Sequence, residues 1–216
     1  MERNRRDYEV KPRKMPFYSF VKRLFDLLVS CLALLILSPL FLVLTLWIRS
    51  DGGPAFYKQV RVGKDGKTFV LLKFRSMIVG ADSPEILKKL EELNEQDGPA
   101  FKIKNDPRIT KVGRFIRKYS LDELPQLINI VRNEMSIVGP RPPLVTEVER
   151  YDEYQKQRLG VKQGLTCFWQ CSGRNNLSFD EWIELDLDYI EQRGLWTDLK
   201  ILLKTVPAVI SGEGAS

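Results

Sequence analysis

Residues 120–127 read Ser-Leu-Asp-Glu-Leu-Pro-Gln-Leu, and they place two adjacent carboxylates where a helix is expected to begin. Ser120 and Glu123 match the capping-box pattern. Apolar residues then recur at helical spacing and predict a buried helix face running to about Asn133. Asp122 would lie in the first turn, where free N–H groups and the helix dipole favour an ionised carboxylate and attract phosphate. The plainer alternative is that both acids only cap a helix.

Composition limits the chemistry that this chain can carry out alone. It has 216 residues, 34 Lys and Arg against 28 Asp and Glu, and a formal charge of +6, which suits anionic surfaces or nucleotides. The sequence contains no histidine, so histidine bases, histidine metal ligands and Ser–His–Asp triads are excluded within the chain. Any metal would be held by oxygen or sulfur, and a hard cation such as Mg²⁺ is the natural candidate. Three cysteines do not form a disulfide framework and indicate a reducing compartment.

An apolar run of 25 residues, 24–48, follows a basic N-terminal segment, 1–23. Its length suits a membrane span. Pro39 follows Ser38 inside the run, and a proline there removes the N–H that would bond the carbonyl of Leu35. The two halves would measure about 22 Å and about 15 Å, both shorter than the ~30 Å hydrocarbon core. We therefore expect a broken helix.

Positive charge flanks the apolar run on both sides. Residues 1–23 contain eight Lys or Arg residues and residues 49–75 contain seven. Because positive charge favours the cytoplasmic side, both ends are expected there, which a re-entrant helix satisfies and a single crossing does not. A proline-kinked span remains the alternative. A cleaved signal peptide fits poorly, because the basic leader and the apolar run are both too long.

The rest of the chain predicts a small α/β domain that is mainly helical. Two strands, 56–62 and 68–74, flank an Asp-Gly turn and predict a hairpin. Helices are expected from Ser83, over 109–116, over 146–159, and from Ser178, whose Glu181 completes a second capping box. Residues 101–103 are expected to form a short strand and residues 160–177 a loop. An amphipathic helix over 195–210 would pack in the core or lie on a bilayer.

Several cations are candidate phosphate ligands. Arg141 lies within Pro140-Arg141-Pro142-Pro143, where the prolines would fix an extended backbone around it. Arg117 precedes Asp122 by five residues, and Lys73 is a weaker candidate. A guanidinium suits the recognition of phosphate oxygens. For each cation, an ordinary surface charge is the alternative. Three loop residues are candidates for contact with a nucleotide or sugar, and a structural role in the loop is the alternative; they are Gln170, Arg174 and Asn175.

These blocks together resemble the bacterial sugar transferases, or monotopic phosphoglycosyl transferases. The resemblance runs from Lys22-Arg23 to the C-terminus and rests on blocks that occur in the family's order. They are Lys22-Arg23, Ser38-Pro39, Lys73 to Met77, Ser120 to Leu127, Ser136 to Pro142 and Gln170 to Arg174. The chain looks closest to the undecaprenyl-phosphate galactose or glucose phosphotransferases. It departs from them at Gln163, Cys167 and Cys171, and it does not include the further transmembrane helices and regulatory domain of the long members.

The resemblance implies transfer of a sugar-1-phosphate from a UDP-sugar to polyprenyl (undecaprenyl) phosphate, with release of UMP, as the first membrane step of exopolysaccharide or O-antigen assembly. It implies that Asp122 is the nucleophile, that Asp122 and Glu123 hold Mg²⁺, and that the candidate cations and loop residues bind substrate. It places Lys22, Arg23, Ser38 and Pro39 at the interface of a phospholipid bilayer. The domains would be a basic segment (1–23), a re-entrant helix (24–48) and a transferase domain (49–216) on the cytoplasmic face of the bacterial inner membrane.

Other functions fit parts of the sequence. A membrane-anchored Mg²⁺ phosphohydrolase would use the same acids, and a non-catalytic scaffold of glycan machinery would not need them. No nucleic-acid partner is expected, because the basic residues gather near the apolar run without an aromatic-interleaved stripe. The sequence leaves open whether the chain is a monomer or a homodimer, and which sugar it would transfer.

Overall fold

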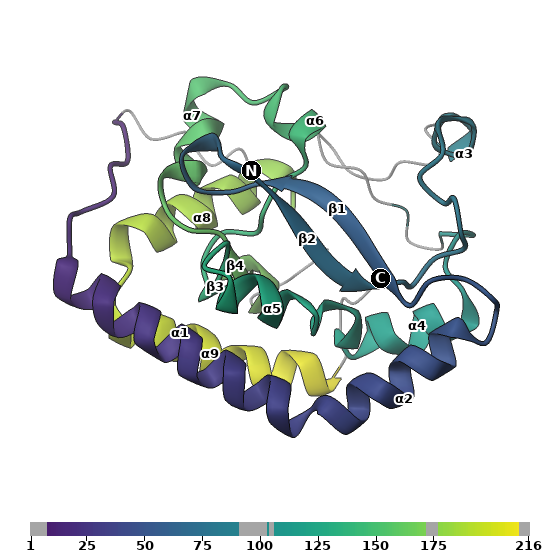
Figure 1. Cartoon of the computed structure of the whole chain (residues 1–216). Helices are drawn as coiled ribbons and strands as arrows, with labels where there is room; N and C mark the ends of the chain where they lie inside the picture. Colours follow the sequence, from purple (N-terminus) through teal and green to yellow (C-terminus); the bar gives the residue numbers. More distant parts are fainter. Residues whose placement is uncertain (1–7, 91–102, 104–105, 172–176, 212–216) are drawn as a thin grey trace.

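The computed structural model describes residues 8–90, 103, 106–171 and 177–211. Two long N-terminal helices underlie the molecule, a β-hairpin crosses above them, and shorter helices surround the hairpin (Figure 1). The long helices are α1 (Pro16–Ile36) and α2 (Ser38–Arg49). The expectation of a mainly helical fold with a short antiparallel hairpin is therefore confirmed.

The predicted hairpin is present with the predicted bounds. Strand β1 (Phe56–Val62) pairs antiparallel with β2 (Thr68–Phe74), so that Tyr57 lies opposite Lys73. The turn requires a left-handed backbone at Asp65 and Gly66, with φ of 56° and 78°. Aspartate and glycine tolerate this conformation better than other residues, which explains the Asp-Gly pair.

The predicted break in the N-terminal apolar run is also present. Helices α1 and α2 meet at a bend of 62°. Pro39 supplies no N–H to the Leu35 carbonyl, and the Ser38 hydroxyl donates to that carbonyl instead at 2.8 Å. No single helix among the described residues is long and apolar enough to cross a membrane, whereas the bent pair together has that length and composition.

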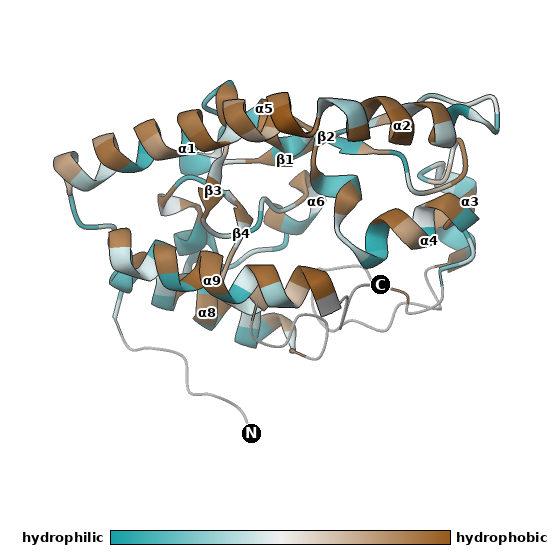
Figure 2. Cartoon of the chain, turned by 90° about the horizontal axis from the view of Figure 1, so that it is seen from below, coloured by the Kyte–Doolittle hydropathy of each residue, from teal (hydrophilic) through white to brown (hydrophobic). Residues whose placement is uncertain are grey.

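Helix α1 buries polar side chains and exposes apolar ones, the reverse of a surface helix in a water-soluble domain. Asp26 and Ser30 are 3% and 0% exposed, whereas Leu28 and Leu32 are 60% and 57% exposed. Exposed apolar side chains continue along α2 and along α9 (Leu195–Ser211). Seen from below, hydrophobic residues mark all three helices (Figure 2). Polar groups thus face the protein and apolar groups face outward.

The inward groups of α1 bind other elements. Arg23 donates to the last carbonyls of α5 (Gln126–Val131), to Ile130 O at 2.7 Å and to Val131 O at 3.0 Å. Asp26 accepts from the Ser136 hydroxyl at 2.8 Å and from the Ile137 N–H at 3.1 Å.

Lys22 joins a buried polar cluster at the base of α9. Its ammonium lies 2.7 Å from the Asp198 carboxylate, which also accepts from the hydroxyls of Tyr18 at 2.9 Å and Tyr189 at 3.0 Å. Lys22 and Arg23 are therefore bound by protein groups, and their contact with lipid headgroups stays a prediction.

The main core lies between α5, a short parallel sheet and α8 (Phe179–Gln192). The sheet pairs β3 (Ser136–Val138) with β4 (Gly164–Thr166), a pairing the sequence did not predict. Asn129 on α5 ties the core to the hairpin, since its amide accepts from Leu72 N–H at 3.0 Å and donates to Val70 O at 2.7 Å. A smaller cluster of Leu44, Ile48, Phe74 and Ile116 joins α2, β2 and α4 (Lys111–Lys118).

Two predicted helices are wrong in detail. Ser120 has φ of 54° and does not cap a helix; residues Leu121–Glu123 form a 3-10 turn, and α5 begins only at Gln126. The helix predicted over 146–159 is divided into α6 (Val145–Val148), α7 (Glu153–Lys156) and a 3-10 turn.

The other predicted helices stand. Ser178 and Glu181 form the predicted capping box before α8, α9 covers the predicted amphipathic segment, and α3 (Pro84–Leu90) begins at the predicted proline. Ile103 is not in a strand, and the remainder of the strand predicted over 101–103 lies outside the described residues.

Candidate active site

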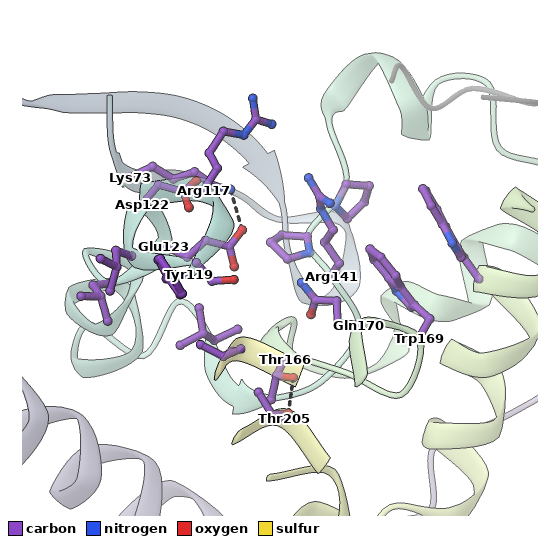
Figure 3. Close-up of a pocket in the computed structure, with 18 of the residues that line it drawn as sticks. Lys73, Arg117, Tyr119, Asp122, Glu123, Arg141, Thr166, Trp169, Gln170 and Thr205 are labelled. Atoms are coloured by element: carbon purple, nitrogen blue, oxygen red, sulfur yellow. Dashed lines mark hydrogen bonds and ion pairs between the residues drawn. The ribbon is translucent and has the colours of Figure 1, made fainter. Parts of the chain in front are cut away.

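A cavity of about 490 Å³ opens between the 3-10 turn that carries the acid pair and the proline-rich loop that carries Arg141. Lys73, Arg117, Asp122 and Glu123 lie on one side, and Arg141, Gln170 and Trp169 lie on the other (Figure 3). Lys73 comes from β2, Arg117 from the end of α4, and Gln170 from the segment after β4. Six residues that were separate candidates in the sequence thus line one cavity.

The acid pair is held by the lysine of β2. Lys73 Nζ lies 2.7 Å from Glu123 Oε1 and 3.9 Å from Asp122 Oδ2. The left-handed backbone of Ser120 permits this arrangement, because it turns the chain sharply between α4 and the 3-10 turn. Asp122 and Glu123 therefore reach the cavity from a tight turn instead of from the first turn of a long helix.

The two adjacent carboxylates have different electrostatic environments. Burial raises the pKa of Asp122 to about 6, with Lys73 opposing the change and Glu123 adding to it. Burial also disfavours ionisation of Glu123, but the charges of Lys73 and Arg141 outweigh it and hold the pKa of Glu123 below its usual value. At neutral pH both groups are ionised, and Asp122 is the stronger base.

The cavity is cationic around these acids. Burial holds the pKa of Arg117 below its ordinary value, and the charge of Asp122 offsets part of this shift. The Arg117 guanidinium is therefore within electrostatic reach of the Asp122 carboxylate. The Arg141 guanidinium lies 5.9 Å from the ring centre of Trp169, which stacks on Trp182 at 4.6 Å. Cations that face a cavity are ready to bind an anion such as a phosphate.

Two of the residues that depart from the family pattern, Gln163 and Cys167, support the side of the cavity that carries Gln170. Cys167 is fully buried, burial raises the pKa of its thiol, and its Sγ donates to Gln170 Oε1 at 3.3 Å. Gln163 is fully buried and donates to Val161 O at 3.1 Å. Cys171 is partly buried, and both it and Cys167 are free thiols.

Two predicted site residues, Arg174 and Asn175, lie outside the described residues. Three charged residues near or in the cavity wall were not predicted as site residues, and these are Arg61, Arg158 and Glu147. They are distant from the acid pair in the chain, and only tertiary structure brings them to it.

The acid pair is too small a ligand set to hold a metal alone. Among the described residues, no group of three or more His, Cys, Asp or Glu side chains converges in a way that could hold an ion. The oxygens of Asp122 and Glu123 nevertheless have the chemistry that Mg²⁺ prefers, and this ion commonly uses one or two carboxylates together with substrate phosphates and water. The residues fit an ion that arrives with a phosphorylated substrate.

Comparison with known proteins gives one consistent family. The model of the bacterial sugar transferase family matches residues 17–212. The galactosyl transferase CpsE of Streptococcus agalactiae is 46% identical over 213 residues, which cover 96% of this chain and 47% of that protein. The undecaprenyl-phosphate galactose phosphotransferase of Salmonella typhimurium is 47% identical over 203 residues, covering 91% of this chain and 42% of that protein.

A shorter relative matches over almost its whole length. The exopolysaccharide production protein ExoY of Rhizobium meliloti is 44% identical over 205 residues, covering 93% of this chain and 90% of that protein. The chain spans about half the length, or less, of the two relatives above. Since the family model matches residues 17–212, a range that includes the acid pair and both candidate arginines, this protein belongs to the bacterial sugar transferase family.

Proposed function

We propose that this chain transfers a sugar-1-phosphate from a UDP-sugar to undecaprenyl phosphate and releases UMP. The observation that carries the proposal is the acid pair facing Arg141 across a cationic cavity. The names of two relatives support the substrates, one being an undecaprenyl-phosphate galactose phosphotransferase and another a UDP-glucose:undecaprenyl-phosphate glucose-1-phosphate transferase. Exopolysaccharide assembly is the corresponding pathway class, as the name of ExoY indicates.

In the first step, the Asp122 carboxylate attacks the phosphorus that carries the sugar. The bond between this phosphorus and the bridging oxygen of the diphosphate breaks, and UMP leaves with that bond's electron pair. The product is a phosphosugar esterified to Asp122. The raised pKa of Asp122 supports this role, because a buried and weakly solvated carboxylate is a better nucleophile than an exposed one.

In the second step, a phosphate oxygen of undecaprenyl phosphate attacks the same phosphorus. The bond to Asp122 breaks, the carboxylate is restored, and the product is undecaprenyl-diphosphate-sugar. Arg117 and Arg141 would neutralise phosphate oxygens in both steps, since phosphoryl transfer depends mainly on alignment and on neutralising charge. Gln170, beside Arg141, would orient the donor.

Asp122 and Glu123 would hold Mg²⁺, which relieves the repulsion between the carboxylates and the diphosphate when it is bound. Lys73 Nζ lies 2.7 Å from Glu123 Oε1. Lys73 therefore offsets part of the negative charge of the acid pair, and its ammonium would contact a phosphate oxygen of a bound substrate.

We also propose that α1 and α2 form a re-entrant anchor at the cytoplasmic face of the bacterial inner membrane. The 62° bend and the outward-facing apolar residues of α1, α2 and α9 support this placement. It would hold the site beside a lipid-linked acceptor. Reporter tags at residues 1 and 216 should both be found in the cytoplasm, and a periplasmic tag at residue 1 would show a true crossing instead.

The covalent step can be tested with a UDP-sugar labelled in the sugar and supplied without acceptor. The label should stay on the wild-type protein and be absent from Asp122→Asn, while the exposed turn variant Asp65→Asn should trap as much label as wild type. A phosphohydrolase would instead release sugar phosphate continuously without acceptor. A scaffold would keep its cellular role in Asp122→Asn, and near-wild-type turnover by that variant would exclude the covalent step.

A further inference from the structure

The proline-rich loop that carries Arg141 is fixed through its backbone carbonyls. Four consecutive carbonyls accept hydrogen bonds from other elements. Pro140 O accepts from Gly164 N–H at 2.8 Å, and Pro143 O accepts from Val62 N–H at 3.0 Å. Between them, Arg141 O accepts from Arg158 at 3.2 Å, and Pro142 O accepts from Arg61 at 3.0 Å.

This arrangement follows from the sequence of the loop. Pro140, Pro142 and Pro143 have no N–H, so the backbone of this stretch has little besides its carbonyls with which to bind its neighbours. The three prolines are buried, and Arg141 alone in the loop is partly exposed. The carbonyl contacts therefore fix the position of the Arg141 backbone, from which its side chain extends.

Two of the four donors are buried guanidiniums. Arg61 is 7% exposed, and its remaining donors bond Gln59 Oε1 at 3.0 Å and 2.6 Å. Among the described residues, no carboxylate lies within 4.0 Å of Arg61. Burial and then the charge of Arg141 lower the pKa of Arg61 to about 10, so a second cation lies close to Arg141 at an energetic cost.

Arg158 is held from behind by a buried acid. It is 4% exposed, forms an ion pair of 2.5 Å with the fully buried Asp186, and donates to the Tyr151 hydroxyl at 2.8 Å. Burying such a pair costs several kcal/mol in desolvation, and apolar residues of similar size often stabilise a fold equally well. An ionic pair at this position therefore calls for a reason beyond stability, and its contact with the Arg141 carbonyl supplies one.

We propose that Arg61 and Arg158 are positioning residues that clamp the backbone of the 140–143 loop, so that the Arg141 guanidinium is held ready for a phosphate group. Asp186 orients Arg158 in turn. The proposal rests on the proposed function insofar as the phosphate belongs to a sugar nucleotide. Neither guanidinium needs to touch the ligand, because both are already engaged by protein oxygens.

The test uses the full chain in detergent and inorganic pyrophosphate as the probe, with the dissociation constant measured by calorimetry in metal-free buffer. Arg141→Met should weaken binding about tenfold, and Arg61→Met should weaken it by a similar factor, as expected for a lost charged contact. The double variant Arg61→Met/Arg141→Met should bind within about twofold of Arg141→Met alone, because Arg61 acts through Arg141.

Two further variants separate positioning from stability. Arg158→Met is combined with Asp186→Leu, so that no buried charge is left unpaired, and this pair should also weaken pyrophosphate binding. Arg75→Met removes another buried guanidinium, which does not line the cavity and which binds the Asp51 carboxylate and the carbonyls of Pro54, Met77 and Ile48. It should lower the unfolding temperature and leave the dissociation constant unchanged.

Additive losses in Arg61→Met/Arg141→Met would overturn the proposal, because Arg61 would then contact the anion directly. Unchanged binding in Arg61→Met, or no pyrophosphate binding by the wild type, would overturn it as well. Pyrophosphate binding with the expected coupling, in a wild-type chain that releases no UMP from any UDP-sugar, would refute the proposed function and leave the clamp standing.

Discussion

Asp122→Asn should stabilise the fold while it abolishes transfer. The pKa of Asp122 rises from an ordinary 3.8 to about 6 through burial. At about 1.4 kcal/mol per pKa unit, ionising this group costs about 3 kcal/mol more in the folded protein than in the unfolded chain. Asparagine has nearly the same shape and carries no charge, so the substitution should return about that amount to the free energy of unfolding at pH 7.5.

The sign of the pH dependence follows from the direction of the pKa change. A folded-state pKa above the unfolded value means that the cost of ionisation is absent below about pH 3.8 and complete above about pH 6. The difference between Asp122→Asn and wild type should therefore fall to about half between pH 7.5 and pH 5. Glu123→Gln should act in the opposite direction, since the pKa of Glu123 is lowered and its ionised form stabilises the fold.

The assay is urea unfolding of the three proteins in detergent with EDTA, at pH 7.5 and at pH 5. The neighbouring pair controls for solvent exposure and for damage to the turn, because the two substitutions alter adjacent residues of one cavity wall. The reasoning would be refuted if both substitutions changed the free energy of unfolding in the same direction. It would also be refuted if the Asp122→Asn difference did not depend on pH.

Three other predictions follow from the packing and the site. Gly113→Ala should destabilise the fold by about 3 kcal/mol and reduce turnover, because the new Cβ would lie 1.8 Å from the Ser76 carbonyl oxygen; Gly194→Ala, with nothing within 4 Å, should be nearly neutral in thermal unfolding. Lys22→Met should lower the free energy of unfolding in urea by about 3 kcal/mol, since it leaves Asp198 buried without its cation. A loss below about 0.5 kcal/mol would show that the hydroxyls of Tyr18 and Tyr189 suffice to stabilise the buried Asp198 carboxylate. Removal of divalent ions with EDTA should stop UMP release and added Mg²⁺ should restore it, whereas unchanged release in EDTA would exclude a metal role.

The features that the sequence predicted well are those encoded by neighbouring residues. The hairpin follows from alternation around an Asp-Gly turn, and the start of α8 follows from the Ser178 and Glu181 capping box. The break at Pro39 follows from one missing N–H. In each case the deciding interaction joins residues within a few positions of each other, so a local pattern is sufficient.

The errors arise where distant contacts override local preference. Ser120 and Glu123 have the spacing of a capping box, yet Lys73, 50 residues away in the chain, binds the Glu123 carboxylate and the backbone turns left-handed at Ser120. The pairing of β3 with β4 and the grip of Arg61 and Arg158 on the 140–143 loop are equally distant in sequence. The sequence located the candidate site residues, but their relation to one another depends on the tertiary fold.

The inward-facing polar residues of α1 bind the domain that follows residue 49. We therefore expect that cutting the chain at this boundary would destabilise that domain. Removing α1 would uncover the carbonyl end of α5, which Arg23 now covers, and would strip Asp26 from Ser136 and Lys22 from Asp198. A fragment that begins after α2 would thus lack part of its own interior. We therefore expect that deleting the N-terminal helices to obtain a freely soluble enzyme would yield misfolded material. These helices supply hydrogen bonds and an ion pair to the interior of the remaining domain.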